Sequence, residues 1–233
     1  MNGTLDNFLG GRIKLIQPST GYRAGIDPLF LSASLHPKAE EKILDVGCGT
    51  GYLLKRYAVN NAVYGVDNMR EALEIATQRG VNASMANLNN SLHFKENSFD
   101  VVFLDIFEHL LYPEILLHEI YRVLKPGGKL ILNLPNHFNW SGRYKILKGS
   151  GLDVFRWFPG ADDYNNPHVR FFTYDGAVRF VHLVPFQSIK DYSYFFPRVF
   201  FRVKGVILKK IAIHLAHYRQ DLFAAGFLII GIK

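Results

Sequence analysis

Three glycines at alternate positions, Gly47, Gly49 and Gly51, follow an apolar stretch that begins at Ile43 and holds one carboxylate, Asp45. Glycine adopts left-handed backbone conformations without a steric cost and leaves room for a ligand beside the main chain. The spacing lacks the lysine of a phosphate-binding loop, and its third glycine comes one residue too early for the dinucleotide fingerprint. The stretch therefore predicts a strand that turns sharply into a loop, with a ligand other than a phosphate group close to the backbone.

A second carboxylate, Asp67, ends the next apolar stretch, residues 62–66. It lies about 20 residues after the glycine loop, where an acidic residue can accept hydrogen bonds from the hydroxyls of an adenosine ribose. This placement predicts a ligand whose 2′-hydroxyl carries no phosphate.

Residues 43–54 and Asp67 resemble the first motif and the second-strand acid of the class I S-adenosylmethionine-dependent methyltransferases. Residues 97–102, 107–110 and 122–128 resemble later motifs of the subgroup that holds the ubiquinone-biosynthesis and other small-molecule methyltransferases. The four segments occur in the family's order. The resemblance implies S-adenosylmethionine as the cofactor and methyl transfer as the activity.

The resemblance also implies where the cofactor binds, at the carboxyl ends of the strands. Backbone groups of the glycine loop are expected around its amino acid part, Asp67 on its ribose, and Asn87 and Leu88 beside its adenine. Relatives commonly have an aspartate where Asn87 stands, but an amide oxygen also accepts a hydrogen bond from an amino group. The expected cofactor residues are Tyr22, Asp45, Gly47, Cys48, Gly49, Gly51, Asp67, Asn68, Met69, Asn87, Leu88 and Asp105.

Methyl transfer from a sulfonium is an in-line displacement, so the protein mainly orients the acceptor and, for a hydroxyl, removes its proton. Candidate bases follow the fourth and fifth strands, and we predict His109 and Asp105 as catalytic, since histidine titrates near neutrality. A structural role for His109 is the alternative. Glu108 with His109 offers two metal ligands, too few to predict a site, and no metal is expected.

The acceptor is expected to meet residues 135–184, between the fifth and sixth strands. Segments 135–143 and 168–173 loosely resemble a subgroup associated with glycan, lipid or secondary-metabolite methylation, which implies substrate-binding roles for His137, Arg143, His168 and Arg170. Aromatic side chains are dense here and either pack a lid or stack on an acceptor ring. They are Phe138, Trp140, Tyr144, Phe155, Trp157, Phe158, Tyr164, Phe171, Phe172 and Tyr174.

Alternating strand and helix patterns predict an α/β fold, a Rossmann-like doubly wound sheet with helices on both faces. By resemblance the sheet has seven strands, mostly parallel, with an antiparallel last strand. Expected strands are 43–46, 62–66, 81–85, 100–105, 128–134, 185–192 and 222–232. Expected helices are 51–58, 69–79 and 113–124, the last with Leu116, Leu117, Ile120, Val123 and Leu124 on one side.

We expect a single domain made of an N-terminal segment (1–40) that covers the cofactor, a cofactor-binding core (41–134), an acceptor-recognition insertion (135–184) and a C-terminal part (185–233). Residues 17–27 resemble the N-terminal segment of bacterial tRNA adenine methyltransferases. Those enzymes carry an Asn-Pro-Pro-aromatic motif after the fourth strand, and nothing in residues 104–109 replaces it. The N-terminal likeness is therefore interpreted as structural.

Composition is compatible with this fold. A chain of 233 residues, 48% hydrophobic, can bury one large core. The single cysteine, Cys48, excludes an internal disulfide and favours a cytoplasmic protein. Its place at a helix entrance can lower a thiol pKa, but a small residue that fills the loop is the preferred interpretation. No signal peptide or membrane-spanning segment is expected.

The C-terminal segment 198–233 holds seven basic residues against Asp221 alone, a net +6 of the formal +7. A helix over 198–219 would carry an apolar and a basic side, and such a helix either packs on the domain or lies on the inner face of the membrane. An RNA methyltransferase and a non-catalytic scaffold with this fold remain alternatives, although no RNA-binding module is recognisable. The predicted apolar residues are Phe200, Ile207, Leu208, Ile211, Leu215 and Tyr218, and the basic ones Arg202, Lys209, Lys210 and His217.

Overall fold

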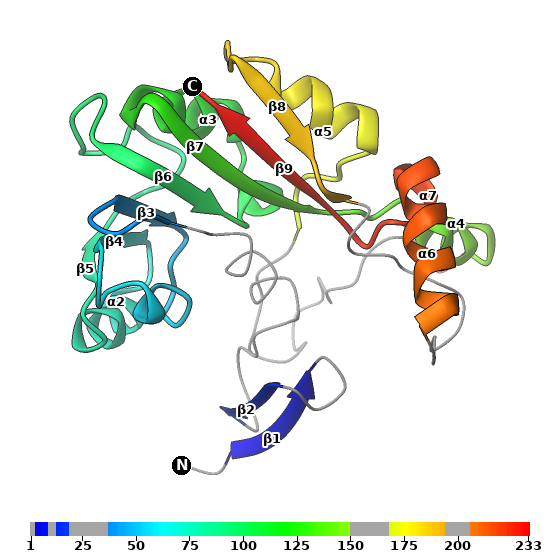
Figure 1. Cartoon of the computed structure of the whole chain (residues 1–233), viewed down its shortest axis with the longest axis horizontal. Helices are drawn as coiled ribbons and strands as arrows, with labels where there is room; N and C mark the ends of the chain where they lie inside the picture. The colour runs from blue at the N-terminus through cyan, green and yellow to red at the C-terminus, as the bar shows by residue number, and fades with distance from the viewer. Residues whose placement is uncertain (1–2, 9–12, 19–36, 150–167, 194–205) are drawn as a thin grey trace.

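The computed structural model describes residues 3–8, 13–18, 37–149, 168–193 and 206–233 (Figure 1). Seven strands form one sheet in the order β5-β4-β3-β6-β7-β9-β8. The chain therefore enters this sheet near its middle, at β3, and continues outward through β4 and β5. It then returns to the other side of β3 with β6. The strands are β3 (Lys42–Val46), β4 (Ala62–Asp67), β5 (Asn82–Met85), β6 (Phe99–Leu104), β7 (Leu124–Pro135), β8 (Ser188–Asp191) and β9 (Gly226–Ile232).

Strand directions confirm the predicted doubly wound sheet. β3 pairs in parallel with both β4 and β6, β4 with β5, and β6 with β7. β9 runs antiparallel to β7 on one side and to β8 on the other. The reversal of winding between β4 and β6 lies at the carboxyl end of β3, where open α/β sheets bind ligands.

Helices cover both faces of the sheet, as predicted. On one face α3 (Pro113–Val123) and α5 (Tyr174–Val181) pack against Val102 and Leu104 of β6. On the other face α2 (Arg70–Gln78) and the 3-10 turn η2 (Leu54–Arg56) pack against Ile43 and Phe103. The predicted apolar side of α3 is fully buried, with Leu116, Leu117, Ile120 and Val123 all at 0% exposure, as is Leu124, which the structure places at the start of β7.

The helix predicted over 51–58 is largely wrong. The structure forms only η2 there, flanked by turns, and η2 closes with a Tyr57 N–H bond to the Leu54 carbonyl. Gly51 has a φ of +65°, outside the helical region, and the chain enters β4 at Ala62. Residues 57–61 form turns that lead into β4, so η2 does not extend into a regular helix.

The insertion contains two helices that the sequence did not predict, α4 (Trp140–Leu147) and α5. Asn139 caps α4 by accepting from the Ser141 and Gly142 amides, and Thr173 caps α5 by accepting from Gly176. Both are favourable N-cap residues. The short helix α7 (Gln220–Phe223) also occupies part of the strand predicted at 222–232, so β9 begins only at Gly226.

Near the N-terminus, β1 (Gly3–Phe8) and β2 (Ile13–Pro18) form a separate antiparallel pair. Tyr22 lies outside the described residues. The division of the chain into a cofactor-covering segment, a core and an insertion therefore stays a prediction.

The C-terminal helix α6 (Val206–Tyr218) packs on the domain differently from the predicted pattern. From position 210 onward, where the structure describes its side chains, Ala212 and Ala216 are buried, at 3% and 0% exposure. Ile211, Leu215 and Tyr218 from the predicted apolar side are 50%, 39% and 79% exposed. Among the α6 side chains whose burial the structure describes, the small alanines are thus buried and these three larger apolar side chains face outward. In the part of the chain that the structure describes, no helix is both long and apolar enough to cross a membrane.

One surface cluster of charges gives a pH-dependent prediction. Hydrogen bonds from Arg122, together with the Leu92 amide, hold the pKa of Glu119 below its usual value. A carboxylate with a lowered folded-state pKa stabilises the protein above its unfolded pKa of about 4.3, and this contribution is lost as the pH falls through the folded value. We expect Glu119→Gln to unfold at a lower temperature than wild type at pH 7. The difference should shrink as the pH is lowered toward about 3, and a difference that stays constant in thermal unfolding would contradict the linkage.

Candidate active site

Hydrogen bonds and close packing fix the conformation of the glycine loop where it leaves β3. The amides of Gly47 and Cys48 both donate to the Val66 carbonyl of β4, at 2.8 and 3.1 Å. Gly47 and Gly51 have positive φ, and a Cβ built on either would lie within 3 Å of neighbouring side chains. These two glycines are therefore required by the packing of the loop itself.

Gly49 differs from its two neighbours. Its φ is +49°, but a Cβ built there meets nothing within 4 Å. Its amide donates to the Asp67 carboxylate at 2.8 Å, and the other oxygen of Asp67 accepts from the Met69 amide at 3.0 Å. Asp67 thus links the glycine loop to the start of α2. Each of its oxygens keeps a further lone pair for a ligand hydroxyl.

Three carboxylates, Asp45, Asp67 and Asp105, come from the carboxyl-terminal ends of β3, β4 and β6. Burial, then the charges of Asp67 and Asp105, raises the pKa of Asp45 well above its usual value. Asp105 accepts a hydrogen bond from Asn133 Nδ2 at 3.0 Å. Two buried acids beside the half-buried Asp105 repel a phosphate and favour a cation. S-adenosylmethionine carries both an ammonium and a sulfonium, so these residues fit the predicted cofactor.

The remaining predicted cofactor residues lie along the same edge of the sheet. Asn68 and Met69 follow β4 and are exposed, and Asn87 follows β5, also exposed, beside the buried Leu88. Cys48 is buried, and burial, with the charges of Asp45 and Asp67, raises the pKa of its thiol. The thiol is therefore protonated at neutral pH, which favours its interpretation as a small residue that fills the loop.

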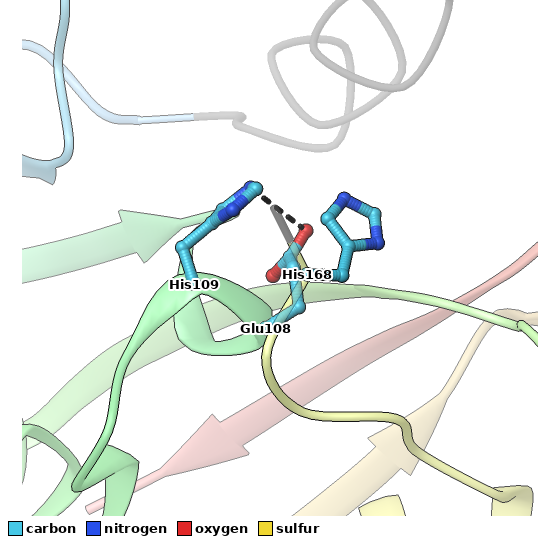
Figure 2. Close-up of side chains that lie close together, drawn as sticks. All are labelled: Glu108, His109 and His168. Atoms are coloured by element: carbon cyan, nitrogen blue, oxygen red, sulfur yellow. Dashed lines mark ion pairs between the residues drawn. The ribbon is translucent and has the colours of Figure 1, made fainter. Parts of the chain in front are cut away.

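A second group of side chains lies beyond the ends of β6 and β7. Glu108 and His109 belong to the 3-10 turn η3 (Phe107–His109), His137 follows β7, and His168 precedes α5. Figure 2 shows Glu108 and His109 rising from η3, with His168 approaching from a different segment. His137 Nε2 lies 2.6 Å from His168 Nδ1, and the rings of His109 and His168 meet edge to face at 4.7 Å. Three of the predicted catalytic and substrate residues are thus brought together.

Backbone bonds hold this histidine cluster in place. The amides of Val169 and Arg170 both donate to the Glu108 carbonyl, at 2.7 and 3.0 Å. Phe172 bridges to Asn136 at the end of β7. Burial, followed by the charge of His109, lowers the pKa of both His137 and His168 to about 4. Both rings are therefore neutral at pH 7, which is the form in which an imidazole binds a metal ion.

The two predicted arginines have structural partners. Arg143 forms an ion pair with Asp221 at 2.8 Å and donates to the Phe138 carbonyl, which links α4 to α7. Arg170 donates to the Leu111 carbonyl through its guanidinium. Their predicted contact with an acceptor stays a prediction.

Comparison with known proteins agrees with this site. Residues 44–132 match the model of a family described as a methyltransferase domain. These residues carry a methyltransferase domain, which agrees with the predicted class I S-adenosylmethionine-dependent family. The recognised family and the predicted fold are both confirmed.

Curated relatives of this methyltransferase domain include an uncharacterised protein of Methanocaldococcus jannaschii, 33% identical over 43% of this chain and 47% of that protein. A ubiquinone biosynthesis O-methyltransferase of Bartonella bacilliformis is 30% identical over 56% of this chain and 55% of its own length. The chain thus spans about half the length of these two relatives.

Solved structures support the fold of the methyltransferase domain. A possible histamine N-methyltransferase of Thermotoga maritima aligns with a TM-score of 0.59 at 22% identity, over 89% of this chain and 88% of that one. A phosphoethanolamine N-methyltransferase of Haemonchus contortus, in complex with phosphomonomethylethanolamine and S-adenosylhomocysteine, aligns at 0.58 and 18% identity, over 89% and 52%. At these identities the likeness concerns the fold.

Two residues beside the site were not anticipated. Asn133, only 7% exposed, holds Asp105, and Asn136, 3% exposed, donates to the Ala224 carbonyl at 2.9 Å and accepts from the Phe138 amide. The available signal was an asparagine inside the apolar stretch 130–135 and another just after it. A polar side chain in a buried strand needs a specific partner.

Proposed function

We propose that this protein is an S-adenosylmethionine-dependent methyltransferase that methylates an oxygen of a small-molecule acceptor. The observation that carries the proposal is the Gly49–Asp67 contact among the three strand-end carboxylates. Beside Gly49 a ligand can approach the backbone, and the Asp67 oxygens can accept further hydrogen bonds. The three carboxylates give the site a negative charge that suits a cationic ligand. The matched domain family and the fold of its neighbours support this proposal.

The expected roles follow from the placement of each residue. The backbone of Gly47 to Gly49 surrounds the amino acid part of the cofactor, Asp67 accepts from its ribose, and Asn87 with Leu88 lies beside its adenine. The cofactor supplies a methyl carbon activated by the sulfonium. The chain itself orients the acceptor and excludes water, because an in-line displacement depends mainly on alignment.

The histidine cluster is the proposed acceptor mouth. His109 follows β6, the strand next to β3, and it lies against His168, so an acceptor beside the two rings would have polar groups close to its reacting oxygen. Matched relatives include a ubiquinone biosynthesis O-methyltransferase, which supports an oxygen acceptor, and a demethylmenaquinone methyltransferase, which supports a quinone-like ring. Phosphoethanolamine N-methyltransferases also match, which keeps a nitrogen acceptor as the second candidate.

The acceptor class is tested with labelled methyl groups. Wild-type protein is incubated with methyl-labelled S-adenosylmethionine and a cell extract, with and without RNase, and the label is traced by fractionation and mass spectrometry. We expect label in small organic molecules, insensitive to RNase, and none with an Asp67→Ala variant. Label that disappears with RNase would show the RNA alternative. No transfer by protein that binds the cofactor would support the scaffold alternative.

A second proposal concerns the membrane, and α6 supports it. Ile211, Leu215 and Tyr218 recur at helical spacing on an exposed side, in a segment with a net charge of +6. An exposed apolar stripe with basic residues suits peripheral binding to anionic lipid. In vesicle sedimentation at low salt, wild type should bind phosphatidylserine vesicles, and Ile211→Asp with Leu215→Asp should not. Leu183→Asp, at another exposed leucine, is the control; binding unaffected by the α6 changes would refute the proposal.

A further inference from the structure

Glu108, His109 and His168 form a cluster with a chemistry that methyl transfer alone does not require. Each offers one ligand atom, and these atoms all lie within 4.8 Å of one another. Glu108 Oε1 and His109 Nε2 are 3.8 Å apart. Figure 2 shows the three side chains directed toward a common point. The sequence offered only the adjacent pair, and the fold supplies the third member from a segment about 60 residues away.

We propose that Glu108, His109 and His168 bind a divalent transition-metal ion at the acceptor mouth. Two imidazoles and one carboxylate suit zinc, manganese, iron or cobalt, whereas calcium and magnesium prefer oxygen ligands. Ligand bonds of about 2.1 Å in a tetrahedral site place ligand atoms about 3.4 Å apart. Side-chain movements on the order of 1 Å would bring the three ligand atoms to that spacing.

The surroundings of His168 determine which of its nitrogens serves as the ligand. Its Nδ1 lies 2.6 Å from His137 Nε2, so His168 would bind the ion through Nε2. The lone pair on Nε2 requires a proton on Nδ1, which then donates to His137. A metal-binding histidine commonly has such a partner on its other nitrogen, which fixes its tautomer and its orientation. His137 is therefore a positioning residue for the site.

Backbone hydrogen bonds also hold the three ligand residues together. The Val169 and Arg170 amides bind the carbonyl of Glu108, so the segment that carries His168 is fastened to the residue that supplies the carboxylate. Glu108 is buried, while His109 and His168 are partly exposed. Three protein ligands leave one or more positions open on the side of the histidines.

The ion deepens the proposed function and rests on it. A hydroxyl bound at the open position loses its proton more readily, because a metal ion stabilises the resulting oxyanion. His109 would then be a ligand, and the proton would leave to solvent. The proposal predicts acceptors with an oxygen that can bind a metal, such as a ring hydroxyl beside a second oxygen.

The test uses tag-free protein treated with a chelator and then titrated with Co²⁺ by calorimetry and visible absorption. We expect one ion per chain, with binding weakened at least about 10-fold in Glu108→Gln and in His168→Ala. His118→Ala, at an exposed histidine on α3, is the matched control and should bind like wild type. His137→Phe should weaken binding and alter the absorption spectrum, which a purely structural role would not do.

Titration of the same preparations with S-adenosylhomocysteine separates this proposal from the proposed function. Cofactor binding retained in all variants shows that they are folded. Absence of a stoichiometric ion, or equal ion affinity in His168→Ala and wild type, would overturn the metal site while leaving the methyltransferase proposal intact. Ion binding by a protein that binds no cofactor would overturn the methyltransferase proposal while leaving the metal site intact. His168→Gln replaces His168→Ala if the alanine variant does not fold.

Discussion

Asp67→Ala is expected to weaken S-adenosylhomocysteine binding by about 100-fold. Hydrogen bonds to a charged group contribute about 1.5–3 kcal/mol each, and the loss of the ribose contacts alone therefore accounts for about 3 kcal/mol. The variant also removes the acceptor for the Gly49 and Met69 amides, so the loop that receives the cofactor loses its fixed position. Calorimetric titration measures the affinity directly.

Asp100→Ala is the matched control for Asp67→Ala. Asp100 also accepts a backbone amide, from Lys42 at 2.9 Å, and pairs with Lys125 at 2.7 Å. It lies near the start of β6, however, at the opposite end of the sheet from the glycine loop. We expect this variant to lose stability but to keep its affinity for the cofactor product. Equal affinities for Asp67→Ala and wild type would refute the assigned ribose contact.

Sequence patterns predicted the sheet well because its signals are local. The apolar run 101–104 inside the expected strand 100–105 indicates a buried strand wherever it lies, and the structure forms β6 over Phe99–Leu104. The glycine loop and Asp67 were likewise predictable, since their geometry depends on neighbouring residues and on adjacent strands. The helix at 51–58 failed because residues 57–61 form turns before β4, and a pattern of apolar residues does not reveal where such turns begin.

The acceptor side was less predictable because its contacts are long-range. His168 reaches His137 and Glu108 only through the course of the insertion between β7 and α5. Nothing in the types of Arg143 or Asp221 specifies that they pair across the fold. Similarly, the side of α6 that faces the domain is set by the small size of Ala212 and Ala216, although the pattern of large apolar residues favoured the other side.

Gly51→Ala is expected to destabilise the fold by about 3 kcal/mol. A left-handed φ costs an alanine about 1 kcal/mol, and overpacking adds typically 1–3 kcal/mol. The new Cβ would lie 2.9 Å from both Ala76 Cβ and Val81 Cγ2, and 3.1 Å from the Ala76 backbone. For a chain of this length the loss corresponds to a fall in Tm of about 6–12 °C, which thermal unfolding without ligand would measure.

Gly49→Ala isolates the two roles of the loop, since it has a similar positive φ but an open Cβ direction. Only the conformational cost of about 1 kcal/mol applies, so its Tm should fall by about 2–4 °C. Its affinity for S-adenosylhomocysteine should nevertheless fall strongly, because the methyl group enters the space proposed for the cofactor. If Gly49→Ala bound the product like wild type, the open side of Gly49 would not face the cofactor. The proposed position of the amino acid part beside this loop would then be wrong, whereas a large fall in Tm for Gly51→Ala would still show that the loop packs as described.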